Sequence, residues 1–444
     1  MKVVIVGGGS AGTTCAFEMR KLNKDVEITI LEKTHNMEYS PCAMPYVLSG
    51  EIKSFAEIVI FNEDDYKRNN INLLLGVEVK RINKETKKIY YSNKDDQEDN
   101  ILYDKLVIAT GSKPVFPIIK GLKEGSYETL KTIEDAKKIS AKIKEGSKSV
   151  IIGSGIIGME LAIALVMKKE HVYLLEKRER MLPNILDNDM SSILEEYLNI
   201  DNLKIKKSID IKEIVNNEII FGDESIKYDQ LYVCCGVIPS VDLARELGLE
   251  VNKGIVVDEY LNTSENDVYA CGDCVESIEF NTNEKVLSQL GTTAVKQAQV
   301  IAQNILQEKL VFPNVLNNTI SKINNVYVGT VGLIEERAKE LNIKTISARY
   351  TVTVRAEYYC KEEKITIKII SDDRGKIIGS QIIGHREVVG RLDLMSLAIQ
   401  KKMSIADFVN IETCYNPASA PIFDPLILTA SILNKKIKIL ISNN

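Results

Sequence analysis

The sequence predicts an α/β protein made of two similar β-α-β domains and an α+β module at the C-terminal end. A glycine-rich loop follows a short buried strand at residues 7–12 and again at 153–158. In both places an apolar helix and a second strand come next. Residues after about 323 read as strands and helix without any such loop, which sets them apart as a separate module.

Length and composition limit the function. The chain has 444 residues, a formal net charge of -5 and 8 cysteines at irregular spacings. The length suits two or three domains, and an acidic chain without a basic block argues against a nucleic-acid partner. Sparse cysteines do not suggest a disulfide framework. Because Met1-Lys2 leads directly into a strand, we expect no signal peptide and a soluble cytoplasmic protein.

One apolar run, Ser149–Met167, is long enough to be considered as a membrane span. Glycines interrupt the run, and Glu160 lies inside it. These residues favour a buried strand, a turn and a helix, so we expect no contact with a membrane.

The first β-α-β unit begins with the strand Val3–Val6, which is apolar without alternation, as in a parallel strand buried on both faces. A helix is predicted from about Ala11 to Leu22, and a second strand from Val26 to Leu31. The glycines of the G-x-G-x-x-G pattern are Gly7, Gly9 and Gly12. They permit a tight turn, close approach of a pyrophosphate and tight helix packing. Glu32, 20 residues after the last glycine, is placed to bind a ribose.

The segment between the two units is rich in predicted strands. They are Leu73–Leu75, Val77–Ile82 and Lys88–Tyr91, and Asn93–Asn100 is expected to be a polar turn. A buried strand from Leu106 then ends in the small-residue turn Thr110-Gly111, and Pro114 and Pro117 mark a linker.

The second unit repeats the first one 146 residues later. Its glycines are Gly153, Gly155 and Gly158. A helical run reaches Met167, and the next strand, His171–Leu175, ends at Glu176, 18 residues after the last glycine. Two complete units of this kind predict two bound dinucleotides, with electron transfer between them.

Two later segments have small-residue turns that involve cysteines. Tyr232–Pro239 resembles a second copy of the strand that ends at Gly111. Cys271-Gly272-Asp273-Cys274 contains a C-x-x-C spacing, but no second pair or nearby histidine completes a zinc site. We therefore expect these cysteines to be packing residues and expect no metal site. A helix follows from about Gly291 to Leu306.

The C-terminal module is predicted to contain strands and a helix. The strands are Thr345–Val354, Lys364–Ile370 and Lys376–Ile383, and the helix is Asp393–Lys402.

The segment from Glu38 to Gly50 contains the candidate reactive cysteine, Cys42. Pro41 disfavours helix for the residue before it, and Pro45 fits the first turn of a helix. Cys42 is therefore expected at a helix N-terminus, where the helix dipole would lower its thiol pKa below about 8.5.

With these motifs the whole chain resembles the pyridine nucleotide-disulfide oxidoreductases. It is most similar to their single-cysteine branch, which includes coenzyme A-disulfide reductases, NADH oxidases, NADH peroxidases and sulfur reductases. The resemblance implies an FAD-binding domain from residues 1–113 and 246–322, an NAD(P)H-binding domain at 114–245 and a dimerisation domain at 323–444. It also implies a homodimer.

The resemblance assigns roles to single residues. Residues implied for FAD and for its surroundings are Gly7, Gly9, Ser10, Ala11, Gly12, Glu32, Lys33, Thr110, Gly111, Gly272 and Asp273. Residues implied for NADH or NADPH are Gly153, Gly155, Ile157, Gly158, Glu176 and Gly236. Residues implied for catalysis are Cys42, Tyr359 and Tyr415, the last of them acting from the partner subunit. Arg20 and Lys21 match basic residues that bind coenzyme A, with a solvated helix face as the alternative.

Departures from the family pattern reduce the number of reactions that the chain is expected to catalyse. The positions five residues from Cys42 are Met37 and Val47, so no intramolecular disulfide forms at the usual spacing. Ser10 and its neighbours stand where NADH peroxidases have a histidine, which disfavours a peroxidase. Cys360-Lys361 replaces the Pro-Gly expected after the Tyr358-Tyr359 pair, which leaves the register of that segment open.

Three functions follow from these expectations. The first is reduction of a sulfur acceptor: coenzyme A disulfide, a persulfide or a polysulfide. The second is oxidation of NADH by O2, to water or hydrogen peroxide. The third belongs to another class, a flavoprotein redox sensor with slow turnover. NADH is expected to be weakly preferred over NADPH, because Glu176 would repel a 2′-phosphate while Lys177 and Arg178 offset that repulsion.

Overall fold

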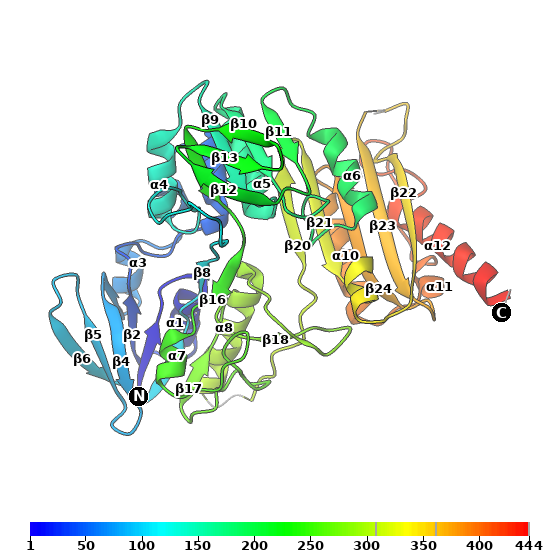
Figure 1. The fold of residues 1–444 in the computed structure, drawn as a ribbon. Helices are drawn as coiled ribbons and strands as arrows, with labels where there is room; N and C mark the ends of the chain where they lie inside the picture. The colour runs from blue at the N-terminus through cyan, green and yellow to red at the C-terminus, as the bar shows by residue number, and fades with distance from the viewer. Residues whose placement is uncertain (307–308, 360–361, 443–444) are drawn as a thin grey trace.

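The first sheet is parallel and lies at the lower left of Figure 1, with its strands in the order β17-β7-β1-β2-β3. The structure is a computed structural model that describes residues 1–306, 309–359 and 362–442. Helices α1 and α8 pack against each other beside the sheet. The bounds are β1 Lys2–Val6, α1 Ser10–Leu22, β2 Glu27–Glu32, β3 Ile71–Leu75, β7 Lys105–Ile108, β17 Val268–Ala270 and α8 Gly291–Ile305. The predicted β-α-β unit is confirmed.

An antiparallel meander, β4-β5-β6, extends this unit. Its strands are β4 Glu78–Asn83, β5 Lys88–Ser92 and β6 Glu98–Leu102. The expectation that Asn93–Asn100 is a turn throughout was wrong, because Glu98–Asn100 belongs to β6. The polar side chains of β6 are compatible with a strand because the strand lies at the edge of the meander and is largely exposed.

The second sheet, also parallel, has the order β11-β10-β9-β15. The apolar run considered as a membrane span divides into β9, a loop and α5, as predicted. None of the helices in the described residues is long and apolar enough to cross a membrane. The bounds are α4 Ile133–Lys142, β9 Lys148–Ile152, α5 Ile156–Met167, β10 His171–Leu175, α6 Asn188–Tyr197, β11 Leu203–Lys206 and β15 Gln230–Val233. A second meander follows: β12 Ile211–Val215, β13 Glu218–Phe221 and β14 Glu224–Lys227.

A short ribbon carries the chain between these two units. Strand β8, Ser112–Pro114, pairs in antiparallel fashion with β16, Val237–Pro239. The Ser240 N–H donates to the Gly111 carbonyl at 2.9 Å, next to the same ribbon. The outgoing and returning segments therefore lie side by side, and helix α7, Asp242–Glu246, follows.

The C-terminal sheet is antiparallel, with the order β20-β21-β24-β23-β22, and lies at the right of Figure 1. Its helix α10 begins at Val388, five residues before the predicted Asp393. The strands are β20 Thr319–Ile323, β21 Val326–Gly332, β22 Thr345–Thr353, β23 Lys364–Asp372 and β24 Ile377–Gly384. The helices are α9 Glu335–Glu340, α10 Val388–Gln400, α11 Ile405–Phe408 and α12 Pro425–Ser442.

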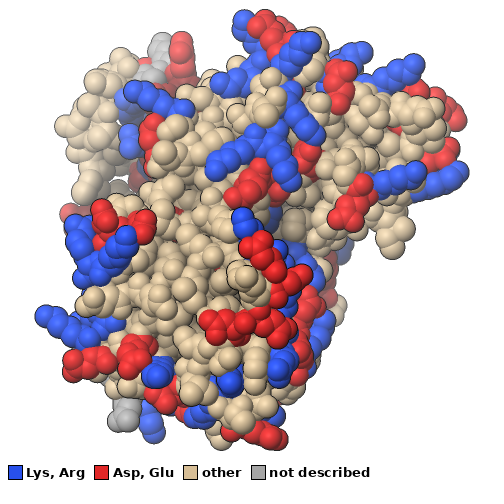
Figure 2. All heavy atoms as spheres, turned by 90° about the vertical axis from the view of Figure 1, so that its left-hand side faces the viewer, with Lys and Arg blue, Asp and Glu red and all other residues tan. Residues whose placement is uncertain are grey.

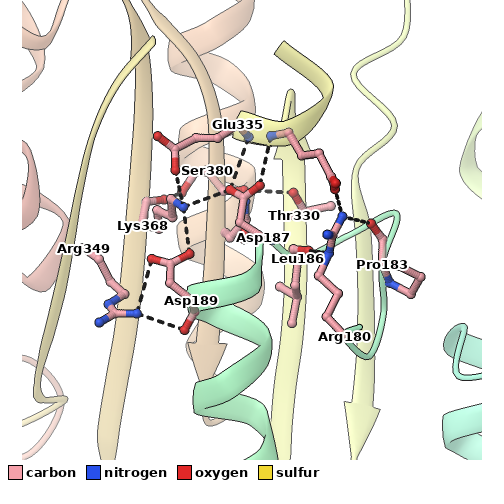
Figure 3. A network of polar contacts seen from close by, with 12 residues as sticks. Arg180, Pro183, Leu186, Asp187, Asp189, Thr330, Glu335, Arg349, Lys368 and Ser380 are labelled. Carbon is pink, nitrogen blue, oxygen red and sulfur yellow. Dashed lines mark hydrogen bonds and ion pairs between the residues drawn. The ribbon is translucent and has the colours of Figure 1, made fainter. Parts of the chain in front are cut away.

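A buried ionic network joins the C-terminal sheet to the second unit (Figure 3). The ammonium of Lys368, on β23, lies 2.9 Å from the carboxylate of Asp187 and 2.8 Å from that of Asp189, and it also pairs with Glu335. Asp187 additionally accepts hydrogen bonds from the backbone N–H groups of Glu335 and Glu336, at the start of α9. These contacts fix α6 against the C-terminal sheet.

Charged side chains of both signs are distributed over the face shown in Figure 2. Lysines and arginines lie among acidic residues, with broad uncharged areas between them. This face therefore presents no extended basic tract.

Candidate functional site

Two positions of the first glycine loop, Gly7 and Gly12, have no room for a side chain. Gly7 has φ +108°, and a Cβ there would lie 2.2 Å from the Ala109 carbonyl oxygen. A Cβ on Gly12 would lie 1.9 Å from the Gly7 carbonyl oxygen. Gly9 has no neighbour within 4 Å of its Cβ position, so the outer side of the loop is open to a ligand.

The residues around this loop fit the pyrophosphate and ribose of a dinucleotide. No side chain caps the N-terminus of α1, which begins at Ser10 and Ala11, so its N–H groups are available for an anion. Glu32 accepts hydrogen bonds from the N–H groups of Gly8, at 2.6 Å, and Thr34, at 2.7 Å. It therefore fastens the loop at the end of β2. Lys33 is different, because its exposed ammonium pairs with Glu78 of the meander at 2.6 Å.

The second loop repeats this construction. Gly153 has φ +103°, and a Cβ on Gly158 would lie 2.0 Å from the Gly153 carbonyl oxygen. Gly155 is open, as Gly9 is. Glu176 accepts hydrogen bonds from the N–H groups of Ser154, at 2.9 Å, and Arg178, at 2.8 Å. Ile157 is exposed in the first turn of α5, which no side chain caps.

Of the small-residue turns predicted from the sequence, the one at Gly272 lies against the first loop, whereas Gly111 and Gly236 lie at the ends of the β8–β16 ribbon. Gly111, Gly236 and Gly272 all have positive φ, and a Cβ on Gly272 would lie 3.1 Å from the Cβ of Ala11. Thr110 Oγ1 donates to the Ser240 carbonyl at 2.7 Å, which holds the ribbon.

Asp273 takes part in a polar cluster that sequence reasoning missed. The Ser112 hydroxyl donates to its carboxylate at 2.7 Å, and the Lys131 ammonium donates to the Ser112 oxygen at 2.8 Å. No local sequence signal marked Lys131, because only the fold brings it to Asp273. Both C-x-x-C cysteines, Cys271 and Cys274, are buried, as the packing interpretation requires, but the same interpretation was wrong for Cys235, which is exposed.

Cys42 lies where the sequence places it, at the beginning of a helix. The 3-10 turn Pro41–Ala43 leads into α2, Met44–Ser49. The buried side chains of Met44 and Leu48 belong to one apolar core with residues of α5, β20 and β21. The Cys42 segment is therefore fixed at the junction of the second unit and the C-terminal sheet.

The pKa of Cys42 differs in direction from the expectation. Although the residue is exposed, protein surrounds much of its Sγ, and this burial raises the thiol pKa. The carboxylates of Glu160 and Asp273 raise the pKa further, while Lys131 lowers it. The expected fall was wrong, because α2 has only six residues and its dipole competes with desolvation and nearby negative charge.

Glu160 is a second residue near Cys42 for which sequence reasoning proposed no role. It accepts a hydrogen bond at 2.6 Å from the hydroxyl of Ser321, on β20. Burial raises the pKa of its carboxyl group to about 7, and the Ser321 hydrogen bond opposes that rise. The one sequence signal that could have drawn attention to Glu160 is that an acidic residue stands inside the otherwise apolar run 149–167.

The predicted tyrosines lie together on the C-terminal module. Tyr358, Tyr359 and Tyr415 are exposed, and the neighbouring Tyr415 hydroxyl raises the pKa of the Tyr358 phenol. Within the described parts of the chain, no hydrogen bond joins them to Cys42. Cys360-Lys361, which bears on their register, lies outside the described residues.

Arg20 is buried and has a structural role, which contradicts both interpretations of that residue, the coenzyme A contact and the solvated helix face. Its guanidinium donates to the carbonyl oxygens of Val26, at 2.7 Å, Asn69, at 2.7 Å, and Asn70, at 2.9 Å. Since these bonds use its donors internally, Arg20 is not available for a nucleotide phosphate. Lys21 pairs with Glu18 on the helix surface at 2.7 Å.

Comparison with known proteins identifies the family. The family model described as pyridine nucleotide-disulphide oxidoreductase matches residues 1–298, and the model for the dimerisation domain of the same family matches residues 321–425. The chain belongs to the pyridine nucleotide-disulphide oxidoreductases. It is thus an oxidoreductase of a family that uses FAD and NAD(P)H.

Similar members of this family have several names. An NADH oxidase of Methanocaldococcus jannaschii is 38% identical over 98% of this chain and 99% of its own length. An NAD(P)H sulfur oxidoreductase (CoA-dependent) of Pyrococcus furiosus is 30% identical over 97% of this chain and 99% of its own length. The structure of an NAD-dependent persulfide reductase from A. fulgidus superposes with a TM-score of 0.95 at 32% identity, covering 99% of this chain and 84% of that one.

Proposed function

We propose that this oxidoreductase passes electrons from NAD(P)H through FAD and Cys42 to a sulfur acceptor, namely coenzyme A disulfide, a persulfide or a polysulfide. The observation that supports this most is the setting of Cys42, an exposed residue, with its Sγ partly enclosed by protein, in a segment fixed at the junction of the structural units. Relatives named for sulfur, persulfide and coenzyme A substrates agree with the proposal.

The chain contributes the positions of the two cofactors. We assign FAD to the first glycine loop, with Glu32 toward a ribose and Asp273 toward the part of FAD near Cys42. NAD(P)H is assigned to the second loop, with Glu176 toward a ribose. When bound, the nicotinamide supplies a hydride and the flavin passes two electrons onward.

Cys42 performs the sulfur chemistry in this proposal. Its thiolate attacks the acceptor, so that one S–S bond breaks, a bond from Sγ forms and the other half leaves as a thiol. Two electrons and one proton then cleave the new bond, which releases the second thiol and restores Cys42. The raised thiol pKa means that Cys42 needs a group that accepts its proton, because the thiolate is the nucleophile.

We propose a homodimer through residues 323–444. Large apolar side chains of this module are exposed, among them the neighbours Ile422 and Phe423. Exposed apolar clusters mark interaction surfaces. In such a dimer, Tyr415 and Tyr359 of one subunit are proposed to act at the Cys42 site of the other.

O2 is a second candidate acceptor, favoured by the similarity to the Methanocaldococcus jannaschii NADH oxidase. The two candidates are separated by following NADH consumption by the purified holoprotein. Anaerobic assays with coenzyme A disulfide or polysulfide are compared with aerobic assays without them. Faster anaerobic turnover with a sulfur compound supports the proposal, whereas turnover with O2 alone supports the oxidase.

Replacing Cys42 tests its role directly. Cys42→Ser is expected to keep its FAD and the reduction of that FAD by NADH, but to lose turnover with sulfur acceptors at least a hundredfold. Cys235→Ser, at another exposed cysteine, is the control and should retain turnover. Full activity of Cys42→Ser with every sulfur acceptor would refute the assignment.

A further inference from the structure

A polar crevice lies between α2, which directly follows the Cys42 turn, α5 and β20. It has a volume of about 20 Å³, and Tyr46, Glu51, Glu160 and Lys322 are among the residues that line it. A cavity of about 10–15 Å³ or more can hold one water molecule if polar partners are present. The hydroxyl of Tyr46 and the carboxyl of Glu160 are partners of that kind. The crevice therefore has the size and the polarity to hold a water molecule beside Glu160.

Glu160 lines this crevice, and α5, the helix that carries it, packs against α2, the helix that directly follows the Cys42 turn. In the described residues Glu160 forms no ion pair, and its hydrogen bond is the one from Ser321. Lys322, the next residue on β20, instead pairs with Glu51 at 2.6 Å. The negative charge of Glu160 raises the pKa of the Cys42 thiol and that of the Tyr46 phenol.

The proposed reaction requires a proton from solvent. Reduction of a disulfide RSSR by NAD(P)H consumes one H⁺ and gives two RSH and NAD(P)⁺. At Cys42 the reductive step is Cys42–S–S–R plus two electrons and H⁺, giving Cys42–S⁻ and HS–R. A hydride is equivalent to two electrons and one proton, so of the two thiol protons one is balanced by the hydride and the other comes from solvent.

We propose that Glu160 relays protons between the crevice and Cys42, and that Ser321 positions its carboxyl group. This rests on the proposed sulfur chemistry. In the attack step the Glu160 carboxylate accepts the proton of the Cys42 thiol and passes it to the first departing thiolate. Glu160 then takes a proton from solvent through the crevice and gives it to the second thiolate when the Cys42–S–S–R bond is reduced, which leaves Glu160 as a carboxylate again.

The titration of Glu160 suits this task. Its carboxyl pKa of about 7 is near the working pH, where a group exchanges protons most effectively. The titratable groups that face it are Cys42, Tyr46 of α2 and Lys322 of β20, with Glu51 paired to Lys322. Strands β9 and β10 also pack on α5, but their Lys148 and His171 do not contribute to the shift.

Glu160→Gln tests the relay because it keeps the shape of the side chain and removes its titration. Turnover with a sulfur acceptor is expected to fall at least tenfold more than the rate of flavin reduction by NADH in stopped flow. Glu170→Gln is the matched control for any cost to the fold, since Glu170 is another buried glutamate bonded to a serine, Ser149. Equal turnover of Glu160→Gln and the wild-type enzyme would overturn the proposal.

Ser321→Ala separates positioning from a purely structural role. Its hydrogen bond lowers the pKa of Glu160, so its loss should move the corresponding limb of the turnover–pH profile to higher pH without abolishing turnover. An unshifted profile would remove Ser321 from the relay.

A second readout does not depend on turnover. The holoprotein is alkylated with iodoacetamide over a pH series, and the mass of the Cys42 peptide is followed. Because ionised Glu160 raises the thiol pKa, Glu160→Gln should shift the alkylation profile to lower pH. Superimposed profiles would overturn the relay. A shifted profile in an enzyme that reduces no sulfur acceptor would instead refute the proposed function and leave the Glu160–Cys42 coupling intact.

Discussion

At the scale of single residues, the glycines of each loop divide into two kinds. Gly7 and Gly12 are required by backbone contacts, whereas a Cβ on Gly9 would meet nothing within 4 Å. In the second loop, Gly153 and Gly158 are likewise required by backbone contacts, whereas a Cβ on Gly155 would meet nothing within 4 Å. The loops therefore separate glycines that the fold needs from glycines that a ligand needs.

Gly12→Ala and Gly9→Ala should consequently fail in different ways. Gly12→Ala forces a Cβ against the Gly7 carbonyl and should lower the free energy of unfolding by about 1–3 kcal/mol, with loss of bound flavin. Gly9→Ala should unfold at nearly the wild-type urea concentration in its flavin-free form but bind FAD more weakly. Flavin absorbance and urea titrations measure both effects. A fully flavinated, stable Gly12→Ala protein would contradict the close packing.

Glu176 should decide the preference between nucleotides. Removing its carboxylate by Glu176→Ala should lower the ratio of kcat/KM for NADH over NADPH by roughly 5–30-fold, which corresponds to about 1–2 kcal/mol. Lys177 and Arg178 are then free to favour a 2′-phosphate. The exposed Glu179→Ala is the neighbouring control. A wild-type enzyme that prefers NADPH would contradict the expected role of Glu176.

At the scale of elements, the contact between α6 and the C-terminal sheet depends on Lys368. Its side chain is only 3% exposed and is surrounded by carboxylates (Figure 3). Buried pairs of this kind are costly to break because the remaining charges stay buried. This connection holds the second unit beside the sheet from which Ser321 reaches Glu160.

Lys368→Met should lower the free energy of unfolding by roughly 3–5 kcal/mol. Lys364→Met, at an exposed position of the same strand, is the control and should change it by about 0.5 kcal/mol or less. Urea unfolding followed by circular dichroism measures the difference. Equal midpoints for the two variants would show that the network does not stabilise the fold.

The same network predicts a dependence on alkaline pH. Burial opposes the charge of Lys368, but hydrogen bonds to Asp189 and Glu335 and the charge of Asp187 outweigh it, so its pKa is raised. A raised pKa means that this stabilisation is complete below the ordinary lysine value of about 10.4 and is lost as pH rises through the folded-state value. The difference in the free energy of unfolding between the wild-type protein and Lys368→Met should therefore be constant from about pH 7 to 10 and shrink above that range. Urea unfolding at a series of pH values measures it.

At the scale of the whole molecule, the C-terminal module provides both the support of the Cys42 segment and the proposed dimer contact. Light scattering should give about twice the chain mass of 49.7 kDa. Replacing both Ile422 and Phe423 by Glu should give monomers that keep FAD but lose turnover. Ile118→Glu, at an exposed apolar position in the linker, should remain dimeric. A fully active monomer would remove the basis for Tyr415 acting across the interface.

The sequence by itself determined both β-α-β units, because strands, glycine loops and terminal acids are encoded by neighbouring residues. It also determined the place of Cys42, since Pro41 and Pro45 restrict the local backbone. Only the tertiary structure decided the direction of the Cys42 pKa, the internal role of Arg20 and the bond from Ser321 to Glu160. These depend on burial and on charges from segments far apart in the chain. No local pattern reports such contacts, because they exist only once the units are packed together.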